Sequence, residues 1–419
     1  MQNILILGAG TAGTIMANRL HKRLDASKWN ITIVNRNNVH YYQPGFLFIP
    51  FGIYEPEQVI KTCSEFLPKG VHFIQEEIRS IDAANNTVLL DNNSTLPYDY
   101  LIVATGVDIH PEETEGMKDG GLWHKDIFDF YTFEGSVALS ERLNDWEGGR
   151  LVINIAEMPI KCPVAPLEFT FLADAYFTKK GIRDKVEIIY VTPLSGAFTK
   201  PAASVLLGDM LVKRNINVVP DFSIGRVDND NKTIVSWDER EVAFDILVSV
   251  PTNKGDAMLE RSNLGDEFSF LPINKHTLRS EKFPNIFAIG DTTNAPASKA
   301  GSVAHFEAEI LTDNLLAAFE GKDLPASYDG HANCFVETGY EKGMLIDFSY
   351  DVEPLPGTFP FPNIGPMKLL GESHFNHYGK IMFRWVYWYM LLTGRDIPLV
   401  PAHFSMAGKK LQAEKLEAA

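Results

Sequence analysis

The pattern of hydrophobic and polar positions predicts an alternation of buried strands and helices from the first residues onward. Residues 4–7, Ile-Leu-Ile-Leu, form a continuous apolar run, which is typical of a strand buried on both faces of a parallel sheet. A helix is predicted over residues 13–24 and a second buried strand over residues 31–34. Strand, helix and strand in this order favour an α/β fold.

The same alternation continues along most of the chain. Residues 55–66 are expected to be helical, and short strands follow at 71–74, 78–81 and 87–90. Further buried strands and helices indicate a second α/β unit and then a return to the first. The strands are expected at residues 101–104, 148–156, 185–192 and 283–291, and the helices at residues 167–180, 205–215 and 300–319.

Three glycines follow the first predicted strand at G-x-G-x-x-G spacing: Gly8, Gly10 and Gly13. In such a turn the first glycine permits a tight bend, and the second lets the backbone approach a pyrophosphate. The third lets the helix pack close to the strand. The motif is weak alone, but here it lies between a strand and a helix. We therefore predict a dinucleotide site, with phosphate held at the helix N-terminus.

The second strand ends in Asn35 and Arg36, where an acidic residue usually binds the ribose hydroxyls. The absence of an acidic residue at this position does not by itself distinguish an FAD site from an NAD site. Residues 37–52, which include Pro44, are aromatic and contain proline, and we expect them to line a pocket.

Composition excludes several classes of protein. The net charge of −16 argues against a nucleic-acid partner, and 419 residues suffice for two or three domains. Three cysteines, Cys63, Cys162 and Cys334, are too few for a disulfide framework. We expect no signal peptide, because the N-terminus already belongs to the first predicted strand, and we expect no transmembrane helix or metal site.

Three motifs occur in a fixed order: GAGTAG at 8–13, LIVATG at 101–106 and FAIGD at 287–291. In this order the sequence resembles the disulfide-reductase-like flavoproteins, which carry two dinucleotide-binding domains. The resemblance implies bound FAD, with Asp291 on the ribityl chain and Thr105, Gly106 and Gly290 near the cofactor.

The segments around two cysteines narrow the resemblance. With IKCPVAPLE at 160–168, NCFVETG at 333–339, SKAG at 298–301 and an aromatic C-terminal segment, the chain resembles sulfide:quinone oxidoreductases. This implies sulfide as electron donor and a membrane quinone as acceptor. Cys334 would lie next to the flavin, and Cys162 would carry a persulfide after sulfide opens a bridge between them.

Three charged residues near these segments are further candidates. Glu168 is a proposed proton carrier near Cys162, and Glu337 is a weaker one near Cys334. Lys299 is expected near the flavin, where a cation would stabilise the reduced ring.

The second unit lacks a glycine turn after its first strand. Residues 156–163 read AEMPIKCP, so no glycine lets the backbone approach a pyrophosphate, and an NAD(P)H site is not expected. Some members of the family that the chain resembles attach FAD covalently through a further cysteine between the two domains. Residues 123–131 of this segment contain no cysteine, so the resemblance implies noncovalent FAD.

The expected fold class is α/β, with two Rossmann-like domains in tandem and a C-terminal membrane-associating region. The FAD-binding domain would be discontinuous, the second domain would lack the NAD(P)H motif, and the last region would bind quinone and membrane. Their expected ranges are 1–110 with 272–325, 111–271, and 326–419.

The C-terminal segment 381–392 is dense in aromatic residues, with Lys380, Arg384 and Arg395 beside or within it. It is too short to span a bilayer and fits a helix lying at the membrane surface. A core helix or a homo-oligomer contact is the alternative. Candidate quinone residues are Phe335, Phe359, Phe361, Tyr378 and Phe383.

Other functions stay open at this point. One is the flavin subunit of a sulfide dehydrogenase that reduces a cytochrome, and another is a non-pumping NADH:quinone dehydrogenase. A third, from a different class, is a flavin-fold protein used for binding or assembly without turnover.

Overall fold

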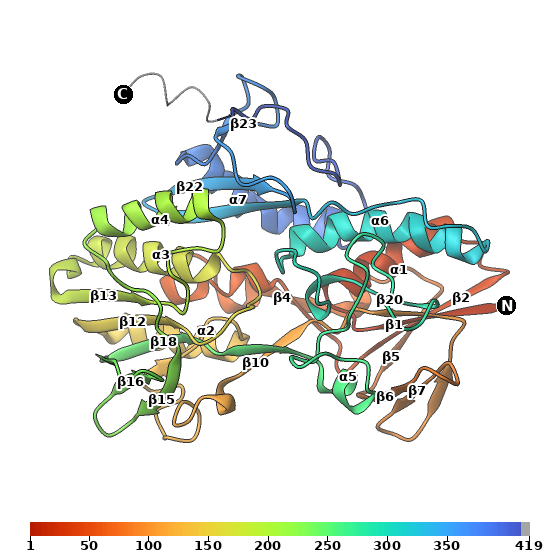
Figure 1. Ribbon diagram of the computed structural model, residues 1–419, viewed down its shortest axis with the longest axis horizontal. Coiled ribbons are helices and arrows are strands. Elements are labelled where there is room, and N and C mark those ends of the chain that lie inside the picture. Colours follow the sequence, from red (N-terminus) through yellow and green to blue (C-terminus); the bar gives the residue numbers. More distant parts are fainter. Residues whose placement is uncertain (412–419) are drawn as a thin grey trace.

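Two α/β units lie side by side, and the C-terminal segment runs across them (Figure 1). This computed structural model describes residues 1–411. The first unit combines the N-terminal part of the chain with β20 and α6 from the region near residue 300, so segments far apart in sequence share one sheet.

The first unit is built on a five-stranded parallel sheet with strand order β20-β9-β1-β2-β5. Ile4 of β1 pairs with Ile31 of β2 and with Tyr100 of β9, so β1 is central and its apolar run is buried. The strands are β1 (Gln2–Leu7), β2 (Trp29–Asn35), β5 (Val71–Gln75), β9 (Tyr100–Val103) and β20 (Ile286–Ala288). Helices α1 (Thr11–Arg23) and α6 (Gly301–Phe319) pack against each other beside this sheet.

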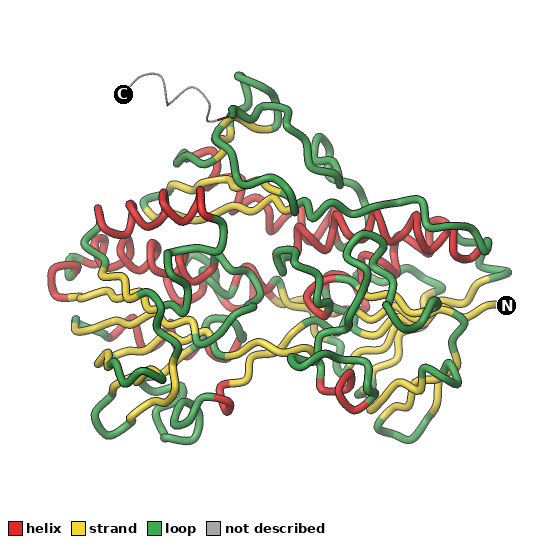
Figure 2. The backbone as a smooth tube through the Cα atoms, viewed as in Figure 1, coloured by secondary structure: helices red, strands yellow, loops and turns green. Residues whose placement is uncertain are grey.

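The second unit repeats this arrangement with strand order β11-β18-β12-β13-β14, again all parallel. Most helices lie above the two sheets in the view of Figure 2. The strands are β11 (Ile127–Phe128), β12 (Gly149–Ile155), β13 (Val186–Val191), β14 (Asn217–Val219) and β18 (Ile246–Val250). The helices are α2 (Phe133–Asp145), α3 (Ala165–Lys180) and α4 (Pro201–Lys213).

Two antiparallel strands connect the units, and small sheets flank them. The connecting pair is β10 (Val107–His110) with β19 (Thr252–Gly255). The small sheet beside the first unit consists of β6 (Ile78–Asp82), β7 (Thr87–Leu90) and β8 (Thr95–Pro97). The one beside the second unit consists of β15 (Ile224–Asp228), β16 (Thr233–Ser236) and β17 (Glu241–Ala243). A short helix, α5, spans Ala257–Arg261.

The expected helix over residues 55–66 is wrong. Two 3₁₀ turns, Pro56–Val59 and Cys63–Glu65, flank the short strand β4 (Ile60–Thr62), which pairs with β3 (Val39–Tyr41). The β-branched residues in this stretch favour a strand, and a capping box starts each turn, so the local chemistry supports interruption rather than a continuous helix.

The C-terminal segment forms a sheet with order β21-β22-β24-β23 and a helix that packs on it. Its elements are β21 (Ala332–Gly339), β22 (Lys342–Phe348), β23 (Gly357–Phe359), β24 (Met367–Leu369), α7 (His374–Val386) and a π-helical turn, Tyr387–Leu391. Among the described residues, none of the helices is both long enough and apolar enough to cross a bilayer.

Candidate functional site

The glycine-rich turn between β1 and α1 has room for a ligand only above Gly10. A Cβ on Gly13 would lie 1.9 Å from the Gly8 carbonyl oxygen, and one on Gly8 would lie 2.4 Å from the Ala104 carbonyl oxygen. A Cβ on Gly10 would meet no atom within 4 Å. The tight packing holds α1 close to β1, and the first-turn N–H groups of α1 face open space that fits a pyrophosphate.

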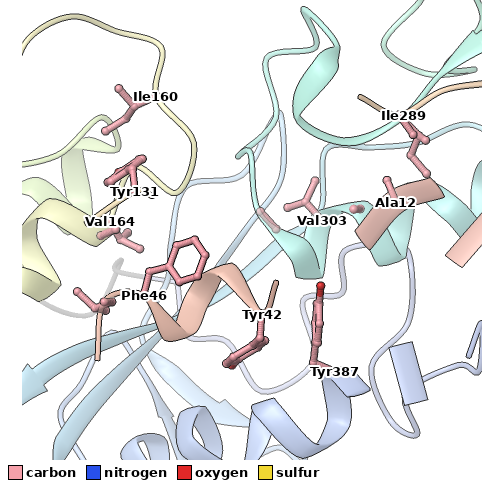
Figure 3. Close-up of a cluster of buried hydrophobic side chains, with 14 of the residues drawn as sticks. Ala12, Tyr42, Phe46, Tyr131, Ile160, Val164, Ile289, Val303 and Tyr387 are labelled. Atoms are coloured by element: carbon pink, nitrogen blue, oxygen red, sulfur yellow. The ribbon is translucent and has the colours of Figure 1, made fainter. Parts of the chain in front are cut away.

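One cavity extends from this turn along the carboxyl ends of the first sheet toward the second unit. All the predicted cofactor residues except Gly13 line it, namely Gly8, Gly10, Asn35, Arg36, Pro44, Thr105, Gly106, Gly290, Asp291 and Lys299. Side chains from all three parts of the chain surround the same region, with Ala12 and Ile289 from the first unit, Tyr131 from the second and Tyr387 from the C-terminal segment (Figure 3).

The side chain of Asn35 forms hydrogen bonds that stabilise the glycine-rich turn. Its Oδ1 accepts a hydrogen bond of 2.9 Å from the backbone N–H of Ala9, and its Nδ2 donates to the carbonyl of Asn37 at 2.8 Å. Arg36 instead pairs with Asp108 at 3.3 Å on the exposed rim. Both residues line the cavity, and Asn35 fixes the turn from the position where an acid usually meets the ribose.

Asp291 and Lys299 form the wall of the cavity after β20. Burial raises the pKa of Asp291, and the charges of Lys299 and Lys161 oppose that rise. The Lys299 ammonium donates to the backbone carbonyls of Asp291 at 2.8 Å and Thr293 at 2.6 Å. Burial lowers the pKa of Lys299. The lysine is therefore a buried support for the turn that carries Asp291.

Cys162 and Cys334 come together from distant segments. Cys162 precedes α3 with φ of 48°, and its N–H donates to the Lys299 carbonyl at 2.7 Å; Cys334 lies on β21. Both thiols are free and half-buried. Cys334 contributes to raising the pKa of Cys162, and Glu168 and Lys380 act on the pKa of both thiols. Cys162 lines the cavity, whereas Cys334 is not among the residues that line it.

The two thiols are kept protonated by their surroundings. Burial raises the pKa of Cys334 to about 11, and Lys380 opposes this increase. Burial raises the pKa of Cys162 further above the usual thiol range, and the Glu168 carboxylate adds to it. The nearby Lys380 ammonium is the charge that favours a thiolate at either position.

A buried ion pair joins α3 to α7 beside the cysteines. The Lys380 ammonium contacts Glu168 Oε1 and also donates to the Phe335 carbonyl at 3.1 Å. Burial raises the pKa of Glu168, and Lys380 opposes this. Glu168 Oε1 also accepts from the N–H of Glu337 at 2.6 Å, but the buried Oε2 has no hydrogen-bond partner among residues 1–411. Glu168 lines the cavity, and a buried carboxylate oxygen without a partner is a group that can hold a proton.

Glu337 has a different partner. Its carboxylate contacts His377 Nδ1 of α7 at 3.0 Å, and this hydrogen bond raises the pKa of His377. Glu337 therefore joins β21 to α7, and it is not among the residues that line the cavity.

The five candidate quinone residues do not line the cavity either. Phe335 packs near Gly379 of α7, while Phe361 and Tyr378 are exposed. Phe359 and Phe383 are half-buried on β23 and α7. Their role in quinone binding stays a prediction.

Several cavity residues were not predicted from the sequence, among them Lys161, Lys380 and Tyr387. Lys380 had been expected to flank a surface helix, but the structure buries it against Glu168. Asn376, Lys380 and Tyr387 are spaced at four and seven residues, so they share the inner face of one helical segment. That spacing was the available signal.

Comparison with known proteins gives a consistent result. The model of the family described as "Pyridine nucleotide-disulphide oxidoreductase" matches residues 2–138. The chain is 28% identical over 400 residues to the mitochondrial sulfide:quinone oxidoreductase of Mus musculus, covering 93% of this chain and 86% of the mouse protein. It is 29% identical to the Dictyostelium discoideum protein of the same name, covering 94% of this chain and 86% of the relative.

The fold matches as well. The crystal structure of the sulfide:quinone oxidoreductase from Aquifex aeolicus superposes with a TM-score of 0.81 at 19% identity, covering 94% of this chain and 92% of that one. The expected resemblance to sulfide:quinone oxidoreductases is confirmed, and so is the disulfide-reductase-like α/β flavoprotein fold.

Proposed function

We propose that this protein is a flavin-dependent oxidoreductase that oxidises sulfide and delivers the electrons to a membrane quinone. The observation that carries the proposal is the meeting of Cys162 and Cys334 beside one cavity, whose other end is a glycine turn. Two relatives that match more than nine-tenths of this chain are named sulfide:quinone oxidoreductase, and this similarity supports the same class of activity.

FAD is the cofactor that we assign to the cavity, held noncovalently. The open space above Gly10 and the N-terminus of α1 would hold its pyrophosphate, and the Asp291 carboxylate would accept hydrogen bonds from its ribityl hydroxyls. Bound flavin supplies a two-electron acceptor beside the cysteines and a donor for the quinone.

The sulfur chemistry follows from the two cysteines. The two thiols are free in this structure, which corresponds to the reduced form of the pair. In the oxidised form, sulfide would attack the sulfur of Cys162 in a Cys162–Cys334 bridge, so that a new S–S bond forms, the old one breaks, and its electron pair leaves on Cys334 as a thiolate. A second sulfide attacks the outer sulfur of the Cys162 persulfide, so that a new S–S bond forms in the product and Cys162 leaves as a thiolate. Closing the two thiolates into a bridge again would release two electrons, for which bound flavin would supply the acceptor.

Glu168 and Lys380 serve these steps. The Lys380 ammonium stabilises whichever thiolate forms, because it is the nearby cation in a buried site. One carboxylate oxygen of Glu168 has no partner in the part of the chain that the structure describes, and burial raises the pKa of this side chain, so Glu168 is suited to take the proton of an entering hydrosulfide.

The exposed face of α7 and of the π-turn is the surface that we assign to the membrane. Its side chains are large and apolar, and they recur at three- and four-residue spacing along the helix. They are Phe375, Tyr378, Met382, Trp385 and Tyr389. A quinone held in the bilayer would then reach the protein next to the helix that carries Lys380.

Anaerobic addition of sulfide to the purified yellow protein tests the proposal. Rapid bleaching of the flavin, followed by its recovery when decylubiquinone is added, is the expected result. Bleaching without recovery would instead favour the cytochrome-reducing sulfide dehydrogenase. Bleaching by NADH but not by sulfide would overturn the proposal in favour of an NADH dehydrogenase.

Covalent attachment is tested separately. Acid or heat should release all of the FAD, and flavin that stays with the denatured chain would contradict the noncovalent assignment.

A further inference from the structure

Tyr387 is the first residue of the π-turn that follows α7, yet its hydroxyl lies at the glycine-rich turn almost 380 residues earlier. The hydroxyl is 2.7 Å from Thr11 Oγ1 and 2.7 Å from His40 Nε2. The side chain is buried and lines the cavity. Figure 3 shows the hydroxyl pointing toward the helices that carry Ala12 and Val303.

The direction of these hydrogen bonds follows from His40. Burial lowers the pKa of His40 to about 4, so the ring is neutral at physiological pH. Its Nδ1 lies 3.1 Å from the carbonyl of Ala9, which can only accept, so Nδ1 carries the proton and Nε2 is an acceptor. Tyr387 therefore donates to His40, and its oxygen accepts from the hydroxyl of Thr11.

These bonds form a closed path around the turn. It runs from Thr11 through Tyr387 and His40 to Ala9, so one C-terminal hydroxyl fixes residues on both sides of Gly10. The Ala9 N–H is held at the same time by Asn35. The peptide groups of the turn are thus oriented before any ligand binds, which lowers the cost of binding.

The residues after Tyr387 hold the rest of α1. Asn18 Nδ2 donates to the Leu392 carbonyl at 2.9 Å, and Lys22 Nζ donates to the Thr393 carbonyl at 2.6 Å. Arg19 pairs with Asp396 at 2.7 Å. The segment 387–396 therefore contacts the helix whose N-terminus would hold the phosphate along most of its length.

We propose that Tyr387 is a positioning residue for the cofactor's pyrophosphate, so that the dinucleotide site is incomplete without the C-terminal segment. This inference rests on the proposed flavin site. It assigns to the segment a role that is separate from any contact with membrane or quinone.

The test compares holoenzymes of wild type, Tyr387→Phe and Tyr389→Phe. Tyr389 is two residues away and exposed, so its hydroxyl is the matched control. Tyr387→Phe leaves His40 and Thr11 without their partner, and we expect flavin release to be about tenfold faster. The ³¹P signals of the bound FAD should also shift, while Tyr389→Phe should match wild type in both measurements.

A second pair of variants keeps the test decisive if Tyr387→Phe does not fold. Thr11→Ser retains the hydroxyl that donates to Tyr387, and Thr11→Val removes it. Rapid flavin release from the valine variant with rescue by serine supports the inference. Equal retention and unchanged ³¹P signals in Tyr387→Phe would overturn it, as would flavin loss that merely follows a lower urea midpoint. Wild-type protein without any flavin would refute the proposed function instead.

Discussion

Glu168 and Lys380 illustrate how strongly two single residues can constrain each other. Both side chains are buried, and each is the main countercharge of the other. A charged side chain buried away from water is stabilised by its opposite charge. Removing either partner of this pair therefore leaves the other buried and uncompensated.

At this scale, the first prediction concerns stability. Lys380→Met should lower the free energy of unfolding by about 3–5 kcal/mol at neutral pH, because Glu168 is left charged and buried. The double variant Lys380→Met/Glu168→Gln should recover much of that loss. Urea unfolding of the three proteins measures both effects, and equal stability of the single and double variants would show that the pair is not coupled.

The second prediction separates the three cysteines. Cys162→Ser and Cys334→Ser should each abolish sulfide-dependent quinone reduction, because neither thiol alone can form the bridge. Cys63 is fully buried, and its Sγ lies 3.7 Å from the Ala9 carbonyl, outside the cavity. Cys63→Ser should retain most turnover. Near-normal turnover in either of the first two variants would remove the redox pair from the mechanism.

The same cysteine variants assign the two roles. If Cys334 lies next to the flavin, Cys162→Ser should keep the long-wavelength charge-transfer band on partial reduction, and Cys334→Ser should lose it. The opposite pattern would assign the flavin-proximal role to Cys162, which is the cysteine that lines the cavity.

Among the elements, β21 and α7 are joined by the His377–Glu337 contact, and this makes their packing sensitive to pH. The Glu337 hydrogen bond raises the pKa of His377 above its ordinary 6.5; Glu341 acts in the same direction, and burial and Lys380 oppose it. Because the folded pKa is raised, the stabilisation is complete below the unfolded pKa and is lost as pH rises through the folded pKa.

The third prediction follows from this loss of stabilisation as the pH rises. His377→Gln should destabilise the protein by about 1 kcal/mol near pH 6 and by clearly less near pH 9. Urea unfolding at both values checks it. A loss that is the same at both values would mean that His377 acts through packing alone.

The exposed face of α7 carries the fourth prediction. Trp385 is 56% exposed on this face, and Trp237, 77% exposed beyond β16, is a matched aromatic control on another element. Trp385→Glu should weaken sedimentation with liposomes and slow quinone reduction more than flavin reduction by sulfide. Trp237→Glu should change neither. Point variants are preferable to truncation from Phe375, which would also remove Lys380 and Tyr387 from the cavity.

Elements with a clear hydrophobic period could be predicted, and those governed by local turn chemistry could not. The helices expected at 13–24, 167–180 and 300–319 match α1, α3 and α6 within a few residues. Residues 55–66 were misread because their strand pairs with a three-residue partner, β3, whose position no periodicity reveals.

At the scale of the whole molecule, four strands follow the same order in the two sheets, β9-β1-β2-β5 in the first and β18-β12-β13-β14 in the second, but the turn after β1 differs from the turn after β12. In the second unit the loop from β12 to α3 contains no glycine. It is held by Asn253, whose side chain accepts from the N–H of Lys161 at 3.0 Å, and it presents Cys162. A loop built to present a thiol has no backbone cradle for a second dinucleotide.

The fifth prediction follows from that loop. NADH should reduce the flavin at least about a hundredfold more slowly than sulfide does under the same anaerobic conditions, since hydride transfer requires an oriented nicotinamide. Stopped-flow absorbance measures both rates. Comparable rates would mean that the second unit binds NADH by another route.

The glycine turn and Asp291 could be found from sequence because each sits at the end of a strand, at a fixed place in the fold. Lys380 and Tyr387 could not be placed, since their positions depend on how the C-terminal segment packs on residues more than 200 positions earlier. The only sign of such long-range packing in the sequence is that the residues concerned recur at helical spacing.

The helical segment from Ser373 to Leu392 has an outer apolar face and an inner face with Lys380 and Tyr387. One inserted or deleted residue within it would rotate everything that follows by about 100°. Lys380 or Tyr387 would then swing outward while an aromatic side chain turned toward the cavity. Natural insertions and deletions in this part of the chain should therefore be confined to the loops on either side, so the length of this segment should vary less between species than its composition.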